Sequence, residues 1–137
     1  MKLPHFSRSY QQFAPLVARV IFGGMFLMGA AFKIPGTAPF LGEVGMSAAQ
    51  GLPFAMIFVA LAFLLEVVCG IAVIVGWHTR HAAFVLAVFT AALTFIFHSD
   101  FADMNSIGQF VSHLGLIAGL LYVSVYGAQS FAVSKDK

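Results

Sequence analysis

Residues 53–76 read PFAMIFVALAFLLEVVCGIAVIVG, a run in which Glu66 is the one charged side chain. At a rise of about 1.5 Å per residue, a helix of this length crosses the roughly 30 Å hydrocarbon core of a bilayer. Lipid cannot satisfy an open sheet edge, and the run is too long and too continuously apolar for a barrel strand. The stretch therefore predicts a transmembrane helix.

Three further apolar runs have similar length, and with the first they predict an all-α integral membrane four-helix bundle. We expect one transmembrane domain over residues 1–137, with spans at about 15–34, 53–76, 81–98 and 107–128. The connection between the first two spans is expected to be a loop, because it is rich in residues that break helices. These are Pro35, Gly36, Pro39, Gly42, Gly45 and Pro53.

Composition excludes several classes of protein. Hydrophobic residues make up 61% of the 137 residues and charged residues 9%, whereas soluble domains have about 45–50% and about 25%. A soluble enzyme, a disordered chain and a nucleic-acid-binding domain are therefore excluded, and the net charge of +2 gives no reason to expect a nucleic-acid partner. The single cysteine, Cys69, permits neither an internal disulfide nor a dithiol redox pair.

The distribution of cations predicts the orientation in a bacterial cytoplasmic membrane. Five cations fall on the side of the termini and the second connection, and Lys33 alone falls on the other side. Both termini are therefore expected to be cytoplasmic. An alternative is that the first apolar run, with Gly29-Ala30-Ala31, is a cleavable signal peptide, although Arg19 would interrupt it. The five cations are Lys2, Arg8, Arg80, Lys135 and Lys137.

Ionisable residues inside the spans are costly and normally face the bundle interior with a partner. Glu66 lies past the middle of its span, and Arg19 lies near the same side of the first span. We expect an Arg19–Glu66 ion pair, which would be structural and fix the register of two helices. The functional alternative is that Glu66 relays a proton.

Lys33, His98 and His113 form the candidate ligand-binding set, because all three fall in the half of the bundle opposite the termini. An ammonium and two imidazoles supply hydrogen-bond donors to a carbonyl or anionic ligand. Each also has a structural interpretation, as an interfacial lysine or a packed histidine. No metal site is expected; His98, Asp100 and Asp103 are weak candidates, since their spacing is not diagnostic.

The ordered polar and glycine positions resemble the DoxX/DoxD-like family of small four-span membrane proteins over about residues 15–125. The first span runs from Arg19-Val-Ile-Phe-Gly23 to Gly29-Ala-Ala-Phe-Lys33. The second contains Glu66-Val-Val-Cys-Gly70, with Cys69 where a glycine is common, followed by Gly76-Trp-His-Thr-Arg80. The third ends with Phe97-His98. His113 has no counterpart in this pattern.

The resemblance implies a link to membrane redox chemistry, since some family members resemble subunits of thiosulfate:quinone oxidoreductases and others accompany complexes that handle oxidative or thiol stress. We expect a redox-linked subunit that binds a quinone, or that anchors an oxidoreductase partner at the quinone pool. We expect no intrinsic cofactor. We expect a bound quinone, contact with membrane lipid, and either a homo-oligomer or a complex with a redox partner subunit.

Two other functions remain open. One is a non-catalytic scaffold or assembly subunit. In that case the Gly115-x-x-x-Gly119 motif and the alanines at 83, 87 and 91 would form an interface between proteins. A small-solute transporter is less favoured, because the chain has no evident inverted repeat.

Overall fold

The computed structural model describes residues 7–134, in which the chain forms five helices and no strand. The helices are α1 (Arg8–Ala31), α2 (Ala38–Ala49), α3 (Ala55–Val75), α4 (Thr79–Phe97) and α5 (Met104–Tyr126). Of these, α1, α3, α4 and α5 are long and apolar enough to cross a membrane. The expected all-α architecture with four spans is confirmed.

The helix boundaries follow the spans expected from the sequence most closely in the second and third spans. The largest difference is at the first, where α1 begins at Arg8 rather than near Pro15. Ser7 caps this helix by accepting a hydrogen bond from the backbone N–H of Tyr10 at 3.2 Å, and the helix continues through Pro15. The helix ends at Ala31, which places Lys33 in the turn that follows.

The expectation of a loop between the first two spans is wrong, because α2 occupies its middle. Thr37 caps α2 by accepting a hydrogen bond from the backbone N–H of Phe40. Pro39 falls in the first turn, where its missing N–H costs nothing. A Cβ at Gly42 or Gly45 would meet no atom within 4 Å. Thr37-Ala38-Pro39 therefore starts a helix, although the many Pro and Gly residues of the connection had predicted a loop.

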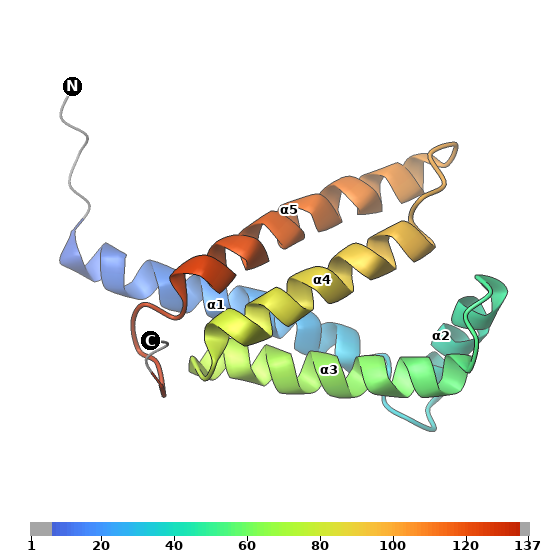
Figure 1. Ribbon diagram of the computed structural model, residues 1–137, viewed down its shortest axis with the longest axis horizontal. Helices are drawn as coiled ribbons and strands as arrows, with labels where there is room; N and C mark the ends of the chain where they lie inside the picture. Colours follow the sequence, from blue (N-terminus) through green and yellow to red (C-terminus); the bar gives the residue numbers. More distant parts are fainter. Residues whose placement is uncertain (1–6, 135–137) are drawn as a thin grey trace.

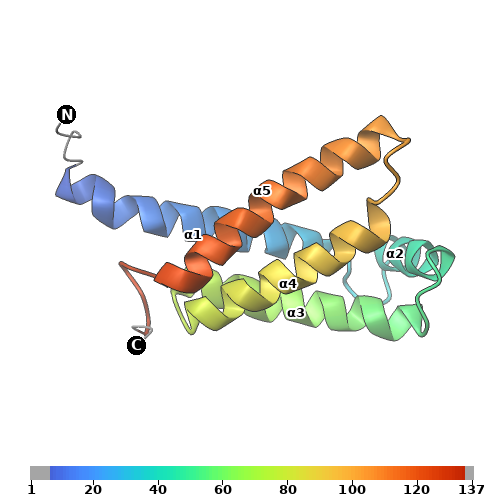
Figure 2. The ribbon, with the colours of Figure 1, turned by 45° about the horizontal axis from the view of Figure 1, so that its top comes forward.

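Helix α3 is central in the packing. It contacts α1, α4 and α2, and α5 packs along α4. The start of α1 and the end of α5 lie at one end of the bundle, and α2 lies at the other end, beside the start of α3 (Figures 1 and 2). Lys2, Lys135 and Lys137 lie outside the described residues, and the cytoplasmic location of the termini stays a prediction from charge.

The core is small and lies where α1, α3, α4 and α5 meet. Leu86 and Leu120 are fully buried there, together with Phe26 and Val73. Ala83 and Ala87 are also buried in this core, so this part of the alanine stripe packs within the chain and is not available to another protein. Two of the three alanines that the scaffold hypothesis assigned to an interface are therefore packed inside the bundle.

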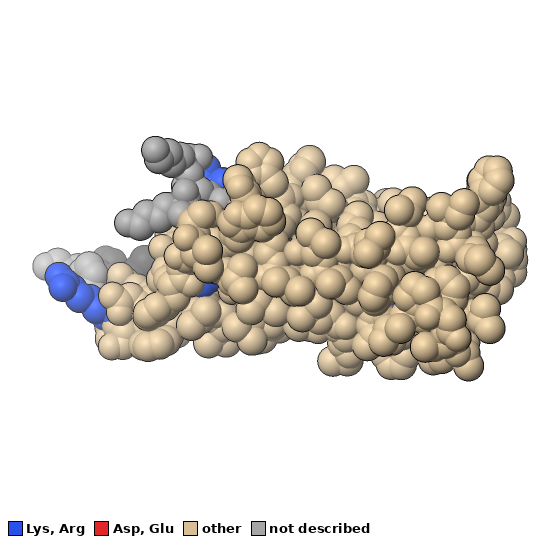
Figure 3. Space-filling view, turned by 90° about the horizontal axis from the view of Figure 1, so that it is seen from below, with Lys and Arg blue, Asp and Glu red and all other residues tan. Residues whose placement is uncertain are grey.

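Most large apolar side chains of the long helices face outward, as expected for helices in contact with lipid. Val20, Leu61, Val88 and Val125 are examples, one from each of the four helices. On the face shown in Figure 3, the basic side chains of the described residues occur only toward the end that carries the termini, and none of their acidic side chains is visible. This apolar belt supports a membrane location for the bundle.

Gly23 allows α1 and α3 to approach closely. A Cβ at this position would lie 2.5 Å from the carbonyl oxygen of Gly70 and would also collide with Ile74. A Cβ at the neighbouring Gly24 would meet no atom within 4 Å. The two glycines therefore form a matched pair, one packed and one open.

A Gly23→Ala substitution is expected to destabilise the protein by about 1–3 kcal/mol, because the backbones must separate to admit the methyl group. Gly24→Ala is the control. It should be neutral or stabilising by up to about 1 kcal/mol, since alanine favours the helix. Unfolding in mixed detergent measures both. Equal effects of the two substitutions would contradict the close packing at Gly23.

The segment after α5 folds back over the end of the bundle. The backbone N–H groups of Val133 and Ser134 donate to the carbonyls of Val75 and Gly76, at 3.0 and 3.2 Å. They thereby satisfy carbonyls at the C-terminal end of α3, which have no partner within the helix. The ring of Phe131 also stacks on that of Phe13. We call residues 128–134 the return segment.

Candidate functional site

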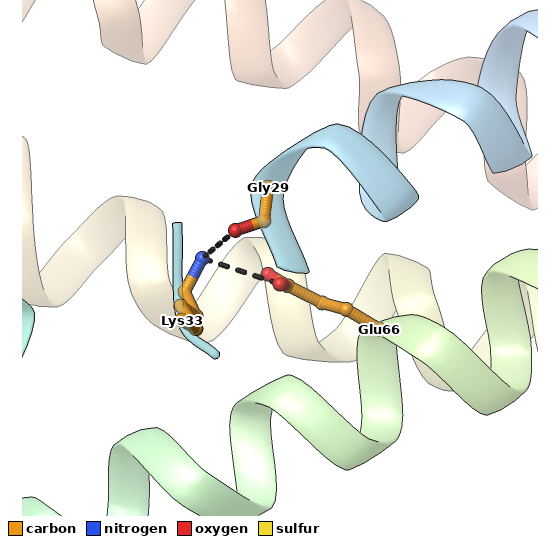
Figure 4. Close-up of polar contacts among 3 residues, drawn as sticks. All are labelled: Gly29, Lys33 and Glu66. Carbon is orange, nitrogen blue, oxygen red and sulfur yellow. Dashed lines mark hydrogen bonds and ion pairs between the residues drawn. The ribbon is translucent and has the colours of Figure 1, made fainter. Parts of the chain in front are cut away.

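A buried ion pair joins α3 to the turn after α1. The Nζ atom of Lys33 lies 3.2 Å from Oε2 of Glu66 and donates a hydrogen bond to the carbonyl oxygen of Gly29, also at 3.2 Å (Figure 4). The side chains are 14% and 6% exposed, respectively. Because the pair is largely shielded from solvent, the two charges attract each other more strongly than the charges of an exposed pair would. Each charge also needs the other, since an unpaired charge in this place would be costly.

The predicted Arg19–Glu66 pair is wrong, since Glu66 pairs with Lys33. The reason is the register of the antiparallel helices α1 and α3. A Cβ at Gly29 would lie 3.5 Å from Oε2 of Glu66, so Glu66 is level with Gly29. Arg19 precedes Gly29 by ten positions in α1, about 15 Å along the helix. The side chains cannot span this distance.

Arg19 instead holds the return segment at the other end of the bundle. Its side chain is 1% exposed, and its Nη2 atom donates to the carbonyl oxygens of Ser130 and Phe131 at 2.6 and 3.1 Å. Gly76, with φ of +76°, ends α3 beside it, and a Cβ there would collide with the guanidinium. The position therefore requires glycine both for its conformation and for space.

Lys33, His98 and His113 line one cavity of about 440 Å³, which we call the α2-side cavity. His98 ends α4 and His113 lies in α5, with their ring centroids 5.1 Å apart. The structure thus brings together the three side chains that the sequence placed in one half of the bundle. Apolar residues from α2, α3 and α4 form much of the remaining wall, among them Met46, Phe58, Val59, Leu93 and Phe97.

A second cavity of about 350 Å³, the central cavity, lies among α1, α3, α4 and α5. Glu66 lines this cavity, and Lys33 and His113 line both cavities. The ion pair is therefore next to the space in which the histidines lie. A ligand in the central cavity would be within the reach of the ammonium of Lys33, the imidazole of His113 and the carboxylate of Glu66.

Several polar residues near these cavities were missed by the sequence analysis, and three of them matter most for the site. Glu43 and Gln50 reach the α2-side cavity from α2, a helix that the sequence analysis had taken for a loop. Thr94 is 1% exposed, and its Oγ1 atom lies 2.9 Å from Nδ1 of His113. A hydroxyl in an apolar helix is a weak signal, and only the pairing of α4 with α5 reveals its partner.

The weak metal candidates do not form a cluster of ligands. No group of three or more His, Cys, Asp or Glu side chains within residues 7–134 is placed to hold a metal ion. Asp100 accepts a hydrogen bond from the backbone N–H of Ala102, and Asp103 caps α5. The backbone N–H of Ser106, 2.8 Å from the carboxylate, is the main reason that the pKa of Asp103 is lowered. Both carboxylates thus have a local structural role.

Comparison with known proteins is consistent with this architecture. Residues 14–99 match the model of the DoxX family. The inner membrane protein YqjF of Escherichia coli (strain K12) is 33% identical over 121 residues, which cover 88% of each chain. No solved structure matches the chain. With its four apolar spans, the chain therefore belongs to the DoxX family and is an integral protein of the inner membrane.

Proposed function

We propose that this protein is a redox-linked membrane subunit that binds a quinone in the α2-side cavity. The observation that carries the proposal is the convergence of Lys33, His98 and His113 on one largely apolar cavity. Its volume of about 440 Å³ falls within the roughly 300–1,000 Å³ of typical small-molecule sites. These residues fit the chemistry of a quinone, which presents a planar apolar ring and two carbonyl oxygens.

Each side chain has a definite task in this proposal. Lys33 and His98 would donate to the ring oxygens, and the aromatic and aliphatic wall would exclude water from them. Glu66 is the candidate for holding and relaying a proton, because its carboxylate lines the adjoining central cavity. A bound quinone would supply the reversible uptake of electrons and protons. A partner oxidoreductase would supply or receive the electrons, since the sequence has one cysteine and no cofactor-binding motif.

The test is quinone binding to the full chain in mild detergent. We expect a short-chain benzoquinone analogue to bind, and His98→Ala to weaken the affinity about tenfold, since it removes a hydrogen-bond donor from an apolar cavity. His81→Ala is the matched control, because His81 is exposed at the opposite end of α4. Unchanged affinity in His98→Ala and in Glu66→Gln would overturn the proposal.

One observation favours a scaffold subunit as the second candidate. A Cβ at Gly115 would meet no atom within 4 Å, whereas one at Gly119 would collide with the ring of Phe22. Only one of the two glycines in the motif is thus packed within the chain, and the other leaves room for a second helix. Mass spectrometry of the purified protein separates the candidates: a stoichiometric protein partner without quinone would favour the scaffold.

A further inference from the structure

Thr94 makes two polar contacts that determine the protonation of His113. Its Oγ1 atom lies 2.6 Å from the carbonyl oxygen of Thr90 and 2.9 Å from Nδ1 of His113. A carbonyl can only accept, so the single hydroxyl proton of Thr94 lies toward Thr90. The hydroxyl oxygen must then accept from the imidazole, which places a proton on Nδ1 of His113.

His113 is neutral in this arrangement, because no carboxylate of residues 7–134 forms an ion pair with it. Glu66, the carboxylate that lines the central cavity with it, is already paired with Lys33, and Glu43, which lines the α2-side cavity, forms no ion pair with His113. A neutral imidazole with a proton on Nδ1 has a lone pair on Nε2 and is an acceptor there. Among residues 7–134, Nε2 has no hydrogen-bond partner, and the side chain lines both cavities.

We infer that Thr94 is a positioning residue that makes His113 a hydrogen-bond acceptor, so that the site prefers the reduced, hydroxyl-bearing form of its ligand, a hydroquinone. This inference rests on the proposed function. A hydroquinone hydroxyl donates to Nε2, whereas a quinone carbonyl would face it lone pair against lone pair. A quinone would leave Nε2 of His113 without a hydrogen-bond donor, and a site binds less tightly a ligand that leaves one of its buried polar groups unpaired.

The tautomer of His113 is measured without any ligand, by nitrogen-15 NMR of the histidine-labelled full chain in detergent. The wild type should show a protonated Nδ1 and an unprotonated Nε2. Thr94→Val, which keeps the shape and removes the acceptor, should move the proton to Nε2, and Thr94→Ser should not. Thr90→Val is the matched control, because it retains the backbone carbonyl to which Thr94 donates.

The ligand preference is measured by binding a short-chain hydroquinone and the corresponding quinone to the same variants. Wild type and Thr94→Ser should bind the hydroquinone more tightly. Thr94→Val should lower the ratio of hydroquinone to quinone affinity about tenfold, as expected for one exchanged hydrogen bond.

The possible failures are distinguishable. Binding of neither form to the wild type would overturn the proposed function and, with it, the ligand preference. Binding of both forms with a ratio that Thr94→Val does not change would overturn this inference alone, as would a wild-type His113 with its proton on Nε2.

Discussion

Lys33→Met is expected to lower the free energy of unfolding by about 3–5 kcal/mol, as is typical when one partner of a buried ion pair is removed. The carboxylate left behind, Glu66, is 6% exposed in an apolar helix. Glu66→Leu should cost less, because Lys33 follows the end of α1 and its long side chain can turn toward the interface. The double variant should recover most of the loss, since no uncompensated charge remains.

A double-mutant cycle in mixed-detergent unfolding measures this coupling. The Lys33–Glu66 cycle should give a coupling free energy of about 2–3 kcal/mol. The control is a cycle between Arg19 and Glu66, in which the two losses should add, because the helix register separates these residues by about 15 Å. Additive losses for Lys33 and Glu66 would show that the ion pair contributes nothing.

Arg19→Met should lower the free energy of unfolding by about 3 kcal/mol and release the return segment. The substitution keeps an unbranched apolar side chain but removes the charged donor to the carbonyls of Ser130 and Phe131. The amides of Val133 and Ser134, which donate to α3, should then exchange their hydrogens faster. Hydrogen exchange of the full chain in detergent reports this directly.

The matched control for Arg19 is Arg8→Met, because Arg8 is exposed in the first turn of the same helix. It should change stability by less than about 0.5 kcal/mol and leave the exchange of the return segment unaltered. Unchanged protection of Val133 and Ser134 in Arg19→Met would mean that the guanidinium does not anchor the segment.

The sequence alone determined the class of fold, because an apolar run of sufficient length has few stable conformations in a bilayer. It also determined which half of the bundle holds Lys33, His98 and His113, since depth in a span follows from position along a helix. These residues do line one cavity. The match to the DoxX family agrees with the motifs quoted from Arg19 to His98.

The partners of these side chains were decided only by tertiary structure. Position along a helix fixes depth but neither its rotation nor its register against a neighbour. The sequence could therefore place Arg19 and Glu66 at roughly similar depth, whereas the contact of Gly23 with Gly70 sets a register that pairs Glu66 with Lys33. The hydrogen bond between His113 and Thr94 depends likewise on how α5 faces α4. The position of the return segment over Arg19 depends on contacts between residues far apart in the chain.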